Sequence, residues 1–446
     1  MKSLIKLLII TVSYLGFAQE TPQNFSLQEA IDFALENNRQ AKNAALDIDA
    51  AKQQKWETTA TGLPQVNATI DYKHWLKQQV QLIPASAFGG PEGEFEEVVF
   101  GTKQNATATA TLSQLLFDGS YLVGLQSAKV YLEISKNAKE KTDLEVRKAV
   151  INAYGNVLMA EESVSILENN IKILEKNLDE TTKIYENGLE EEESVEQLQI
   201  TLSSVQSNLN NTKRLKTLAY QMLSITLGLD YNTPIILTDD LENLTVKNIL
   251  QEGIEDADVK NTIDYRIAAN DKTSKELLLK LEKSKALPTL SAFINGGYNA
   301  FDDQFVFLDS NTRWFGSSLL GVSMNIPIFS SGMRSAATQR AKINLEKAQI
   351  TLDETEQQLK LQIEAAKSDF ILATEEYENK KQNLNLAERI EKKNQTKFFE
   401  GVGSSFELRQ AQTQLYTAQQ EFLQAMLDVI NTKAELETLT NTTTKY

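Results

Sequence analysis

The sequence predicts a mainly helical protein with four membrane-type β-strands, built by internal duplication, and three observations predict this class. Matching segments recur along the 446 residues, so that Gly188 and Gly401 lie 213 positions apart. The longest segments repeat apolar residues in steps of three and four, which is the seam of a coiled coil. Between them the apolar period falls to two, which is typical of a strand with one wet face.

The N-terminus has the features of a secretory signal peptide over residues 1–18. Lys2 and Lys6 flank the start of an apolar core at residues 7–17, and small residues lead up to Ala18. This core is shorter than the roughly 20 apolar residues of a spanning helix. We therefore expect cleavage near Ala18 and export of the mature chain. A buried first helix is the alternative interpretation.

Composition excludes several function classes. The formal net charge is −16 and the basic residues are scattered, which argues against nucleic-acid binding. There is no cysteine, and His74 is the one histidine, so a Cys/His zinc site is impossible. Catalysis by a nucleophile–histidine pair depends on that single residue, which lies beside Trp75 at the end of an expected strand. The sequence predicts no enzyme, no cofactor and no metal site.

The duplication gives each half the same order: helix, Leu-Pro pair, two strands, a very long helix, a glycine turn and a returning helix. Leu63-Pro64 recurs as Leu287-Pro288, and the turn at residues 183–189 recurs at residues 397–402. The predicted segments are a signal peptide (1–18), a helix (19–62), a strand hairpin (63–118), a long helix pair (119–228), a linker (229–262), a second helix (263–286), a second strand hairpin (287–330), a second long helix pair (331–439) and a flexible tail (440–446). The first strand hairpin is the longer, and its extra residues fall in a turn-rich loop at 86–97.

The long helices carry the clearest periodicity. The first seam consists of Val150, Ala153, Val157, Ala160, Val164, Leu167, Ile171, Leu174 and Leu178. The second copy keeps the same steps from Leu359 to Ala387, and only Lys380 breaks the apolar rule. Residues 119–187 contain no proline, which at 1.5 Å per residue predicts a rod of roughly 100 Å. Such rods indicate a spacer, a tunnel or a scaffold.

The four expected strands alternate apolar and polar residues. Val66, Ala68, Ile70 and Tyr72 alternate with polar residues, and so do segments at 106–113, 289–307 and 320–328, the third less regularly because of Phe293. A half-buried sheet in a soluble protein alternates in the same way. The signal peptide, the strand lengths and the lack of a second apolar surface favour a membrane barrel. Aromatic residues that could form its interfacial girdles are Tyr72, Trp75, Trp314 and Phe315.

Four strands cannot close a barrel, because single-chain bacterial barrels begin at about eight. An open sheet edge in lipid would leave backbone groups without hydrogen-bond partners. The chain must therefore associate with other copies, and two, three or four copies would give about 8, 12 or 16 strands. Elementary physics requires an oligomer and leaves its number open.

Several segments together resemble the TolC-like outer membrane efflux proteins. They are LFDGS at 116–120 and IFSSG at 328–332, the tips YENGL at 185–189 and FFEGVGSSFELRQ at 398–410, and the duplicated Leu-Pro pattern. The resemblance covers nearly all of the mature chain. It implies a homotrimer with a 12-stranded outer-membrane β-barrel and a periplasmic α-barrel of long helices, located in the outer membrane of a Gram-negative bacterium. It also implies two partners, a periplasmic adaptor (membrane fusion) protein and an inner-membrane pump, besides outer-membrane lipid.

The resemblance also implies two sites. Acidic side chains one turn past the second tip close the resting channel in this family, and the aligned residues are Glu407 and Gln410, with Glu196 equivalent in the first copy. Gln410 departs from the acidic pattern, so the gate has one or two charged rings. The alternative to a gate is that Glu407 is simply an exposed helix residue. The tips Gly188-Leu189 and Gly401-Val402 resemble the motif that the adaptor grips, although glycine is also favoured by chain reversal itself.

Two function classes follow. The first is a passive exit duct of a tripartite efflux or type I secretion system, opened by the adaptor and driven by the pump. The second is a periplasmic or surface coiled-coil scaffold without channel activity. A hydrolase is a distant third. The sequence does not identify the cargo.

Overall fold

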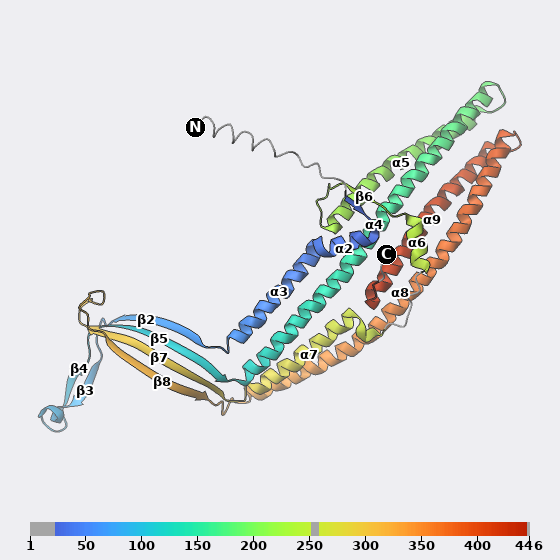
Figure 1. Cartoon of the computed structure of the whole chain (residues 1–446). Coiled ribbons are helices and arrows are strands. Elements are labelled where there is room, and N and C mark those ends of the chain that lie inside the picture. The colour runs from blue at the N-terminus through green and yellow to red at the C-terminus, as the bar shows by residue number, and fades with distance from the viewer. Residues whose placement is uncertain (1–22, 251–257, 444–446) are drawn as a thin grey trace, which may run out of the picture. The chain divides into compact units, whose positions relative to one another are not determined.

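The computed structural model describes residues 23–250 and 258–443, and the predicted signal peptide lies outside these described residues. The chain divides into two compact units, each built from separate stretches (Figure 1). The helix unit contains the described residues within 1–48, 134–269 and 351–446, and the sheet unit contains residues 49–133 and 270–350. Each unit therefore takes segments from both copies of the repeat.

Four long helices dominate the fold. They are α4 (Gly119–Glu186) and α5 (Glu192–Leu227) in the first copy, and α8 (Met333–Phe399) and α9 (Ser405–Thr440) in the second. Within the helix unit α5 returns beside α4, and α9 returns beside α8 (Figure 1). α4 and α8 run for 68 and 67 residues without a break, as expected from segments that contain no proline. The predicted mainly helical class is confirmed.

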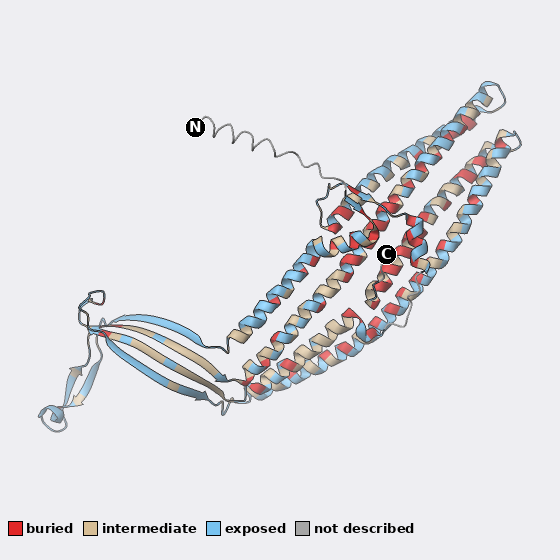
Figure 2. Cartoon of the chain, viewed as in Figure 1, coloured by how far each residue is buried: buried red, intermediate tan, exposed pale blue. Residues whose placement is uncertain are grey.

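The heptad seams form the core of the helix unit. Val150, Val157 and Leu174 of α4 are fully buried, and Leu198 and Val205 of α5 pack against the later part of that seam. Figure 2 shows the same distribution as buried residues along the facing sides of the helices. The periodicity therefore identified the contact faces correctly.

Lys380, the one break in the second seam, lies at the edge of the contact. Its Nζ is 3.2 Å from Glu421 Oε2 on α9, and its side chain is partly exposed. The aliphatic part of the lysine covers the seam while the ammonium group reaches a carboxylate.

The linker is ordered where it is described. Its strand β6 (Ile235–Leu237) pairs in parallel with β1 (Gln23–Phe25), and its helix α6 (Leu241–Leu250) packs against α9. The turn η2 (Val259–Asn261) then leads into α7 (Ile263–Ser284). These contacts attach the linker to both ends of the described chain.

The N-terminal helices are α2 (Leu27–Asn37) and α3 (Arg39–Ala60). A capping box of Ser26 and Glu29 begins α2, and its first residue is held from the linker, since the Leu27 N–H donates to Asp239 Oδ2 at 2.6 Å. Satisfying these first N–H groups fixes where the helix starts.

The sheet unit contains one four-stranded antiparallel sheet in the order β2-β5-β7-β8. The strands are β2 (Gln65–His74), β5 (Gln104–Phe117), β7 (Thr289–Asp302) and β8 (Phe315–Asn325). The central pair, β5 and β7, joins the two repeats, while β2 and β8 form the edges. The four predicted strands are present, although β7 ends five residues before the expected Phe307 and β8 ends before Pro327, which has no N–H to donate.

The register separates the sheet into two chemically different faces. Residues directly opposite one another share a face, and the row Val66, Leu112, Ile294 and Leu320 lies on one side. The next row, Asn67, Thr111, Asn295 and Leu319, lies on the other. The apolar residues of the first side are Val66, Ala68, Ile70, Tyr72, Ala106, Ala108, Ala110, Leu112, Leu290, Ala292, Ile294, Tyr298, Ala300, Leu320, Val322 and Met324, and we call this side the apolar face. The opposite face is mostly Thr, Asn and Ser, and Figure 2 shows few buried residues in these strands.

Phe293 is an exception on the polar face, and Gly321 explains it. The two residues are directly opposite, and a Cβ on Gly321 would lie 2.5 Å from the Phe293 ring. The ring therefore lies over a strand position that has no side chain, an arrangement that stabilises a glycine within a sheet.

The loop predicted at residues 86–97 is only partly a loop. A second hairpin forms from β3 (Val80–Pro84) and β4 (Phe95–Val99), with the short turn η1 (Ala85–Phe88) after β3. The many glycine and proline residues between 84 and 93 mark the turn correctly, but they concealed strands of only five residues.

Candidate functional site: the helix tips and the strand faces

The two helix tips have the same backbone geometry. Gly188 and Gly401 both adopt φ +74°, a region that other residues rarely enter. Leu189 N–H donates to Ile184 O at 3.1 Å, and Val402 N–H donates to Lys397 O at 3.0 Å. These bonds leave Leu189 and Val402 in solvent, with 79% and 74% of their surface exposed. Each tip thus presents one uncovered aliphatic side chain.

The residue aligned with the gate, Glu407, also starts its own helix. Its backbone N–H donates to Ser404 Oγ, and its carboxylate accepts the Ser404 N–H, both at 3.2 Å. This is a capping box, and the negative charge is also favoured near a helix N-terminus. The spacing Ser-x-x-Glu is a sequence signal for this cap, which the prediction of a gate left unused. α5 has no such cap: Ser194 Oγ donates instead to Glu190 Oε1 at 2.7 Å.

The three predicted gate residues lie on two different helix pairs. Glu407 and Gln410 are exposed on the first turns of α9, and Glu196 is exposed on the first turns of α5. All three therefore lie close to the tips, where a constriction would be expected.

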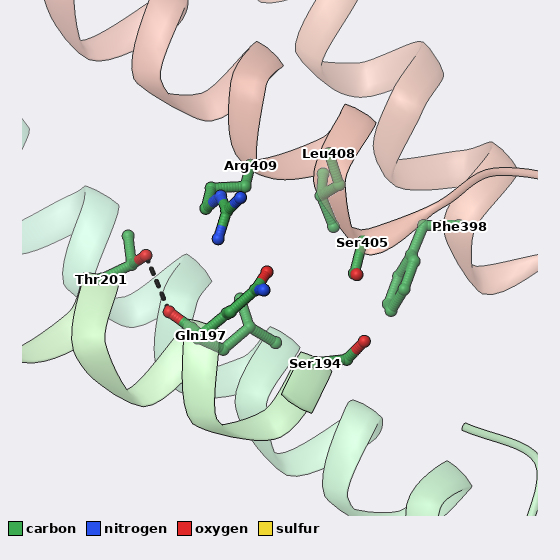
Figure 3. A pocket seen from close by; sticks show the side chains of 8 residues that line it. Ser194, Gln197, Thr201, Phe398, Ser405, Leu408 and Arg409 are labelled. Carbon is green, nitrogen blue, oxygen red and sulfur yellow. Dashed lines mark hydrogen bonds between the residues drawn. The ribbon is translucent and has the colours of Figure 1, made fainter. Parts of the chain in front are cut away.

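A small cavity, mostly apolar in its lining, lies between the helix pairs just behind the tips. Ser194, Gln197 and Thr201 of α5 face Phe398, Leu408 and Arg409 of the second pair across it (Figure 3). The cavity of about 10 Å³ has room for one water molecule. Gln197 Nε2 donates to Glu193 Oε1 at 2.6 Å, whereas its buried Oε1 has no protein partner. No sequence signal indicated this cavity, because its residues come from three helices.

Further from the tips, hydrogen bonds between amides join the two helix pairs. Asn170 Nδ2 donates to Gln419 Oε1 at 2.9 Å, and Gln395 Nε2 donates to Asn177 Oδ1 at 3.1 Å. Both asparagines are buried. Because these contacts are polar, a separation of the pairs here would lose less apolar burial than an apolar seam would.

Glu391 of α8 is partly buried near the second tip. Burial raises the pKa of its carboxyl group, and the adjacent amide of Gln412 opposes that shift. Burial, together with the charge of Glu391, also raises the pKa of the Tyr416 hydroxyl. Glu391 is therefore a partly buried carboxyl group whose pKa is raised above its usual value.

The register corrects the predicted aromatic girdle in one respect. Tyr72 lies on the apolar face of the sheet and contacts Phe305 and Phe307, with ring centroids 5.5 and 5.8 Å away. Phe315 lies on the opposite face, because it pairs with Asn299 in the row of Asp71. Composition shows that aromatic residues cluster here, but only the register shows that Tyr72 and Phe315 cannot belong to one lipid-facing band.

Trp75 directly follows β2 and Trp314 directly precedes β8, so both lie at the end of the sheet where β2 stops. His74 is the last residue of β2 and is exposed. Within residues 23–250 and 258–443, no group of three His, Cys, Asp or Glu side chains could hold a metal ion. In the same ranges, no helix combines the length and the apolar character needed to cross a membrane.

The fold and these surfaces define a duplicated protein that combines long helical hairpins with a sheet that is apolar on one face. A model of the outer membrane efflux protein family matches residues 30–229 and 275–442. The toluene efflux pump outer membrane protein TtgC of Pseudomonas putida is 23% identical over 436 residues, which cover 92% of this chain and 82% of that protein.

Solved structures share the fold. CusC has a TM-score of 0.75 at 16% identity, with 93% of this chain and 91% of that chain covered. The outer membrane channel CmeC of Campylobacter jejuni has a TM-score of 0.73 at 18% identity, with 93% and 85% covered.

The chain belongs to the outer membrane efflux protein family. Its location is therefore the outer membrane, with the helical part in the periplasm, as the sequence predicted. Membership favours the predicted efflux component over the coiled-coil scaffold, and the family is a transport family and not an enzyme family.

Proposed function

We propose that this protein is the passive exit duct of a tripartite efflux or type I secretion system. A homotrimer would supply a β-barrel of about 12 strands from the hairpins at 63–118 and 287–330. The helix pairs at 119–228 and 331–439 would form the periplasmic tunnel, with the linker 229–262 as a belt around it. An adaptor protein would open the duct, and an inner-membrane pump would drive cargo through it. The names of relatives such as TtgC, an efflux pump outer membrane protein, support this assignment.

One observation carries the proposal: the four-stranded sheet has an apolar face and two open edges. Val66 and Ile70 of edge strand β2 have 69% and 84% of their surface exposed. Backbone groups along the outer edges of β2 and β8 also lack a strand partner within the described part of the chain. Lipid would cover the apolar face, but the edges need strands from other copies.

The polar face would line the lumen. It presents hydroxyl and amide groups, for example Thr109 and Asn295, with Asp71 as a carboxylate near the end where β2 stops. Tyr72, Trp75 and Trp314 would form an aromatic band at that end, where amphipathic rings are favoured by the membrane interface.

Control of the duct would lie at the helix tips. Leu189 and Val402, beside Gly188 and Gly401, would be held by the adaptor. Glu407, with Gln410 and Glu196, would narrow the channel. The three copies of Glu407 in a trimer would place like charges around the axis, and these raise the energy of anions and attract cations. Opening would move the helix pairs apart across their amide contacts, such as Asn177 to Gln395.

Reconstitution tests this proposal. The mature protein is extracted from outer-membrane fractions in mild detergent and analysed by gel electrophoresis with and without heating, and then in planar lipid bilayers. We expect a heat-sensitive trimer and discrete conductance steps. A monomer that stays soluble without detergent and conducts nothing would refute the proposal.

A further inference from the structure

The hairpin of β3 and β4 continues the first barrel hairpin beyond the four-stranded sheet. The last pair of β2 and β5 is His74 with Gln104, and the first pair of β3 and β4 is Val80 with Val99. Between them the Trp75 N–H donates to Lys103 O at 2.8 Å. The first strand has one residue more than the second in this interval, and Gly101 adopts φ +90°, so the ladder bends here. We call residues 75–103 the outer extension.

The second repeat has no such extension. β7 and β8 are joined by residues 303–314, which are described throughout and contain no strand. Because only the first repeat carries the extension, the two surfaces that meet at each junction between copies would differ. This asymmetry allows the extension of one copy to meet the loop of the next.

One side of the outer extension is apolar and uncovered. Val80 and Leu82 of β3 share that side with Phe95 and Val99 of β4. Their exposed fractions are 42%, 64%, 63% and 47%. Because an isolated two-stranded hairpin is only marginally stable in water, a cover for this side would stabilise it.

Topology favours a second copy as that cover. β3 continues β2, an edge strand, and closing the proposed barrel places β8 of a neighbouring copy beside β2. Arg313 and Trp314 directly precede β8, and the antiparallel order places them at the end of the sheet where β2 stops. The part of the neighbouring copy nearest to the extension is therefore the rim formed by these two residues.

Charge favours the same partner. Glu97 lies directly opposite Leu82, in the middle of the apolar side, and the extension also carries Glu92, Glu94 and Glu96. A carboxylate in that position opposes insertion of the side into hydrocarbon. Arg313 of the rim makes no ion pair within the described part of the chain, although it lies 4.9 Å from the centre of the Phe315 ring. Arg313 can therefore pair with a carboxylate of the extension, such as Glu97.

We propose that the apolar side of the outer extension docks on the rim of the neighbouring copy, around Arg313 and Trp314. This contact would hold two copies together outside the membrane, across the junction of β2 and β8. The inference rests on the proposed function, because it requires an oligomeric barrel.

The absence of native cysteine makes the test direct. Leu82→Cys and Gln81→Cys place a thiol on opposite sides of the same strand, and each is made in the full-length protein and labelled in outer membranes with a membrane-impermeant maleimide. We expect Leu82→Cys to react about tenfold more slowly than Gln81→Cys, because its side is covered in the native state. In a second pair of variants, Leu82→Cys or Gln81→Cys is combined with Trp314→Cys. Oxidation should then give dimers and trimers with Leu82→Cys and not with Gln81→Cys.

The outcomes separate this inference from the proposed function. Equal labelling and no cross-link, in trimers that conduct normally, would overturn the docking contact and leave the duct intact. Protection that disappears in detergent, while the trimer persists, would mean that lipid covers the side, which also overturns it. Absence of both trimer and conductance in the unmodified protein would overturn the duct and the contact together.

Discussion

The Tyr154 hydroxyl donates a hydrogen bond to Asp239 Oδ2 over 2.9 Å, deep inside the helix unit. The same hydroxyl lies 2.9 Å from the carbonyl oxygen of Phe25, and Asp239 Oδ2 also accepts the Leu27 N–H at 2.6 Å. Burial and the adjacent carboxylate raise the pKa of the tyrosine. One side chain of α4 therefore joins the N-terminal strand, the start of α2 and the linker between the repeats.

Tyr154→Phe should destabilise the helix unit by about 1–3 kcal/mol, because it leaves a partly buried carboxylate and a buried carbonyl with fewer donors. Thermal unfolding of the detergent-solubilised protein, followed by circular dichroism, measures this loss. Tyr220→Phe is the control, since Tyr220 donates to Glu161 Oε1 at 2.9 Å from a partly exposed position. Equal effects of the two substitutions would contradict the special role of Tyr154.

Removing one partner of the ion pair of Arg147 and Glu437 should destabilise the protein more than Tyr154→Phe does. Their side chains are 3.1 Å apart and only 8% and 5% exposed. Glu437→Ala should cost about 3–5 kcal/mol, because it takes this carboxylate away from a buried guanidinium. The exposed pair Lys183–Asp179 provides the control, and Asp179→Ala should cost less than about 1 kcal/mol. Unfolding curves that do not distinguish the two variants would disprove this prediction.

The two roles of Glu407 can be separated. Glu407→Gln keeps an acceptor for the Ser404 N–H but removes the charge, whereas Ser404→Ala removes the cap and keeps the charge. If Glu407 forms the gate, Glu407→Gln should make the resting channel leakier and less cation-selective in planar bilayers. Ser404→Ala should instead lower stability by about 1 kcal/mol and leave selectivity unchanged. Unchanged resting conductance and cation selectivity in Glu407→Gln would assign Glu407 to the cap alone.

Glu391 should make stability depend on pH. The pKa of this carboxyl is higher in the folded than in the unfolded protein, so the folded state binds more protons as the group titrates. Its contribution is therefore most favourable below the unfolded pKa and is lost as pH rises through the folded value. Glu391→Gln should raise the unfolding temperature at neutral pH, and the gain should shrink under acidic conditions. Glu388→Gln, on the exposed side of α8, should show neither effect. A gain for Glu391→Gln that is constant with pH would exclude this explanation.

The two faces of the sheet should differ in their tolerance of charge. Ile70→Arg introduces a cation on the apolar face and should destabilise insertion by about 2–4 kcal/mol if that face meets the membrane midplane. Thr69→Arg, the adjacent residue on the polar face, should cost much less. Denaturant titrations of refolding into lipid vesicles measure both values. Similar losses at the two positions would contradict the assignment of the faces to lipid and lumen.

Local patterns predicted most of the architecture. The steps of three and four from Val150 onward identified the buried side of α4, and the alternation from Val66 to Tyr72 identified the two faces of β2. Both periods follow from the geometry of a single segment, so no contact with another segment was needed to detect them. The glycine turns at the tips were predictable for the same reason.

The site was less predictable. The tip residues Leu189 and Val402 are exposed as a gripping motif requires, but their role remains a prediction. The capping role of Glu407 was readable from Ser404 three residues earlier, and was missed. The amide contact between Asn177 and Gln395 had no sequence signal, since each residue looks like an ordinary polar interruption of a heptad.

The sequence by itself determined the duplication, the long helices, the two periods and the need for further copies to complete a sheet. Only the tertiary structure decided that Tyr72 and Phe315 lie on opposite faces, that residues 75–103 extend the first hairpin, and that Tyr154 meets Asp239. The physical reason is that periodicity is fixed within one segment by backbone geometry. Register and partner choice depend on packing between segments that are far apart in the chain.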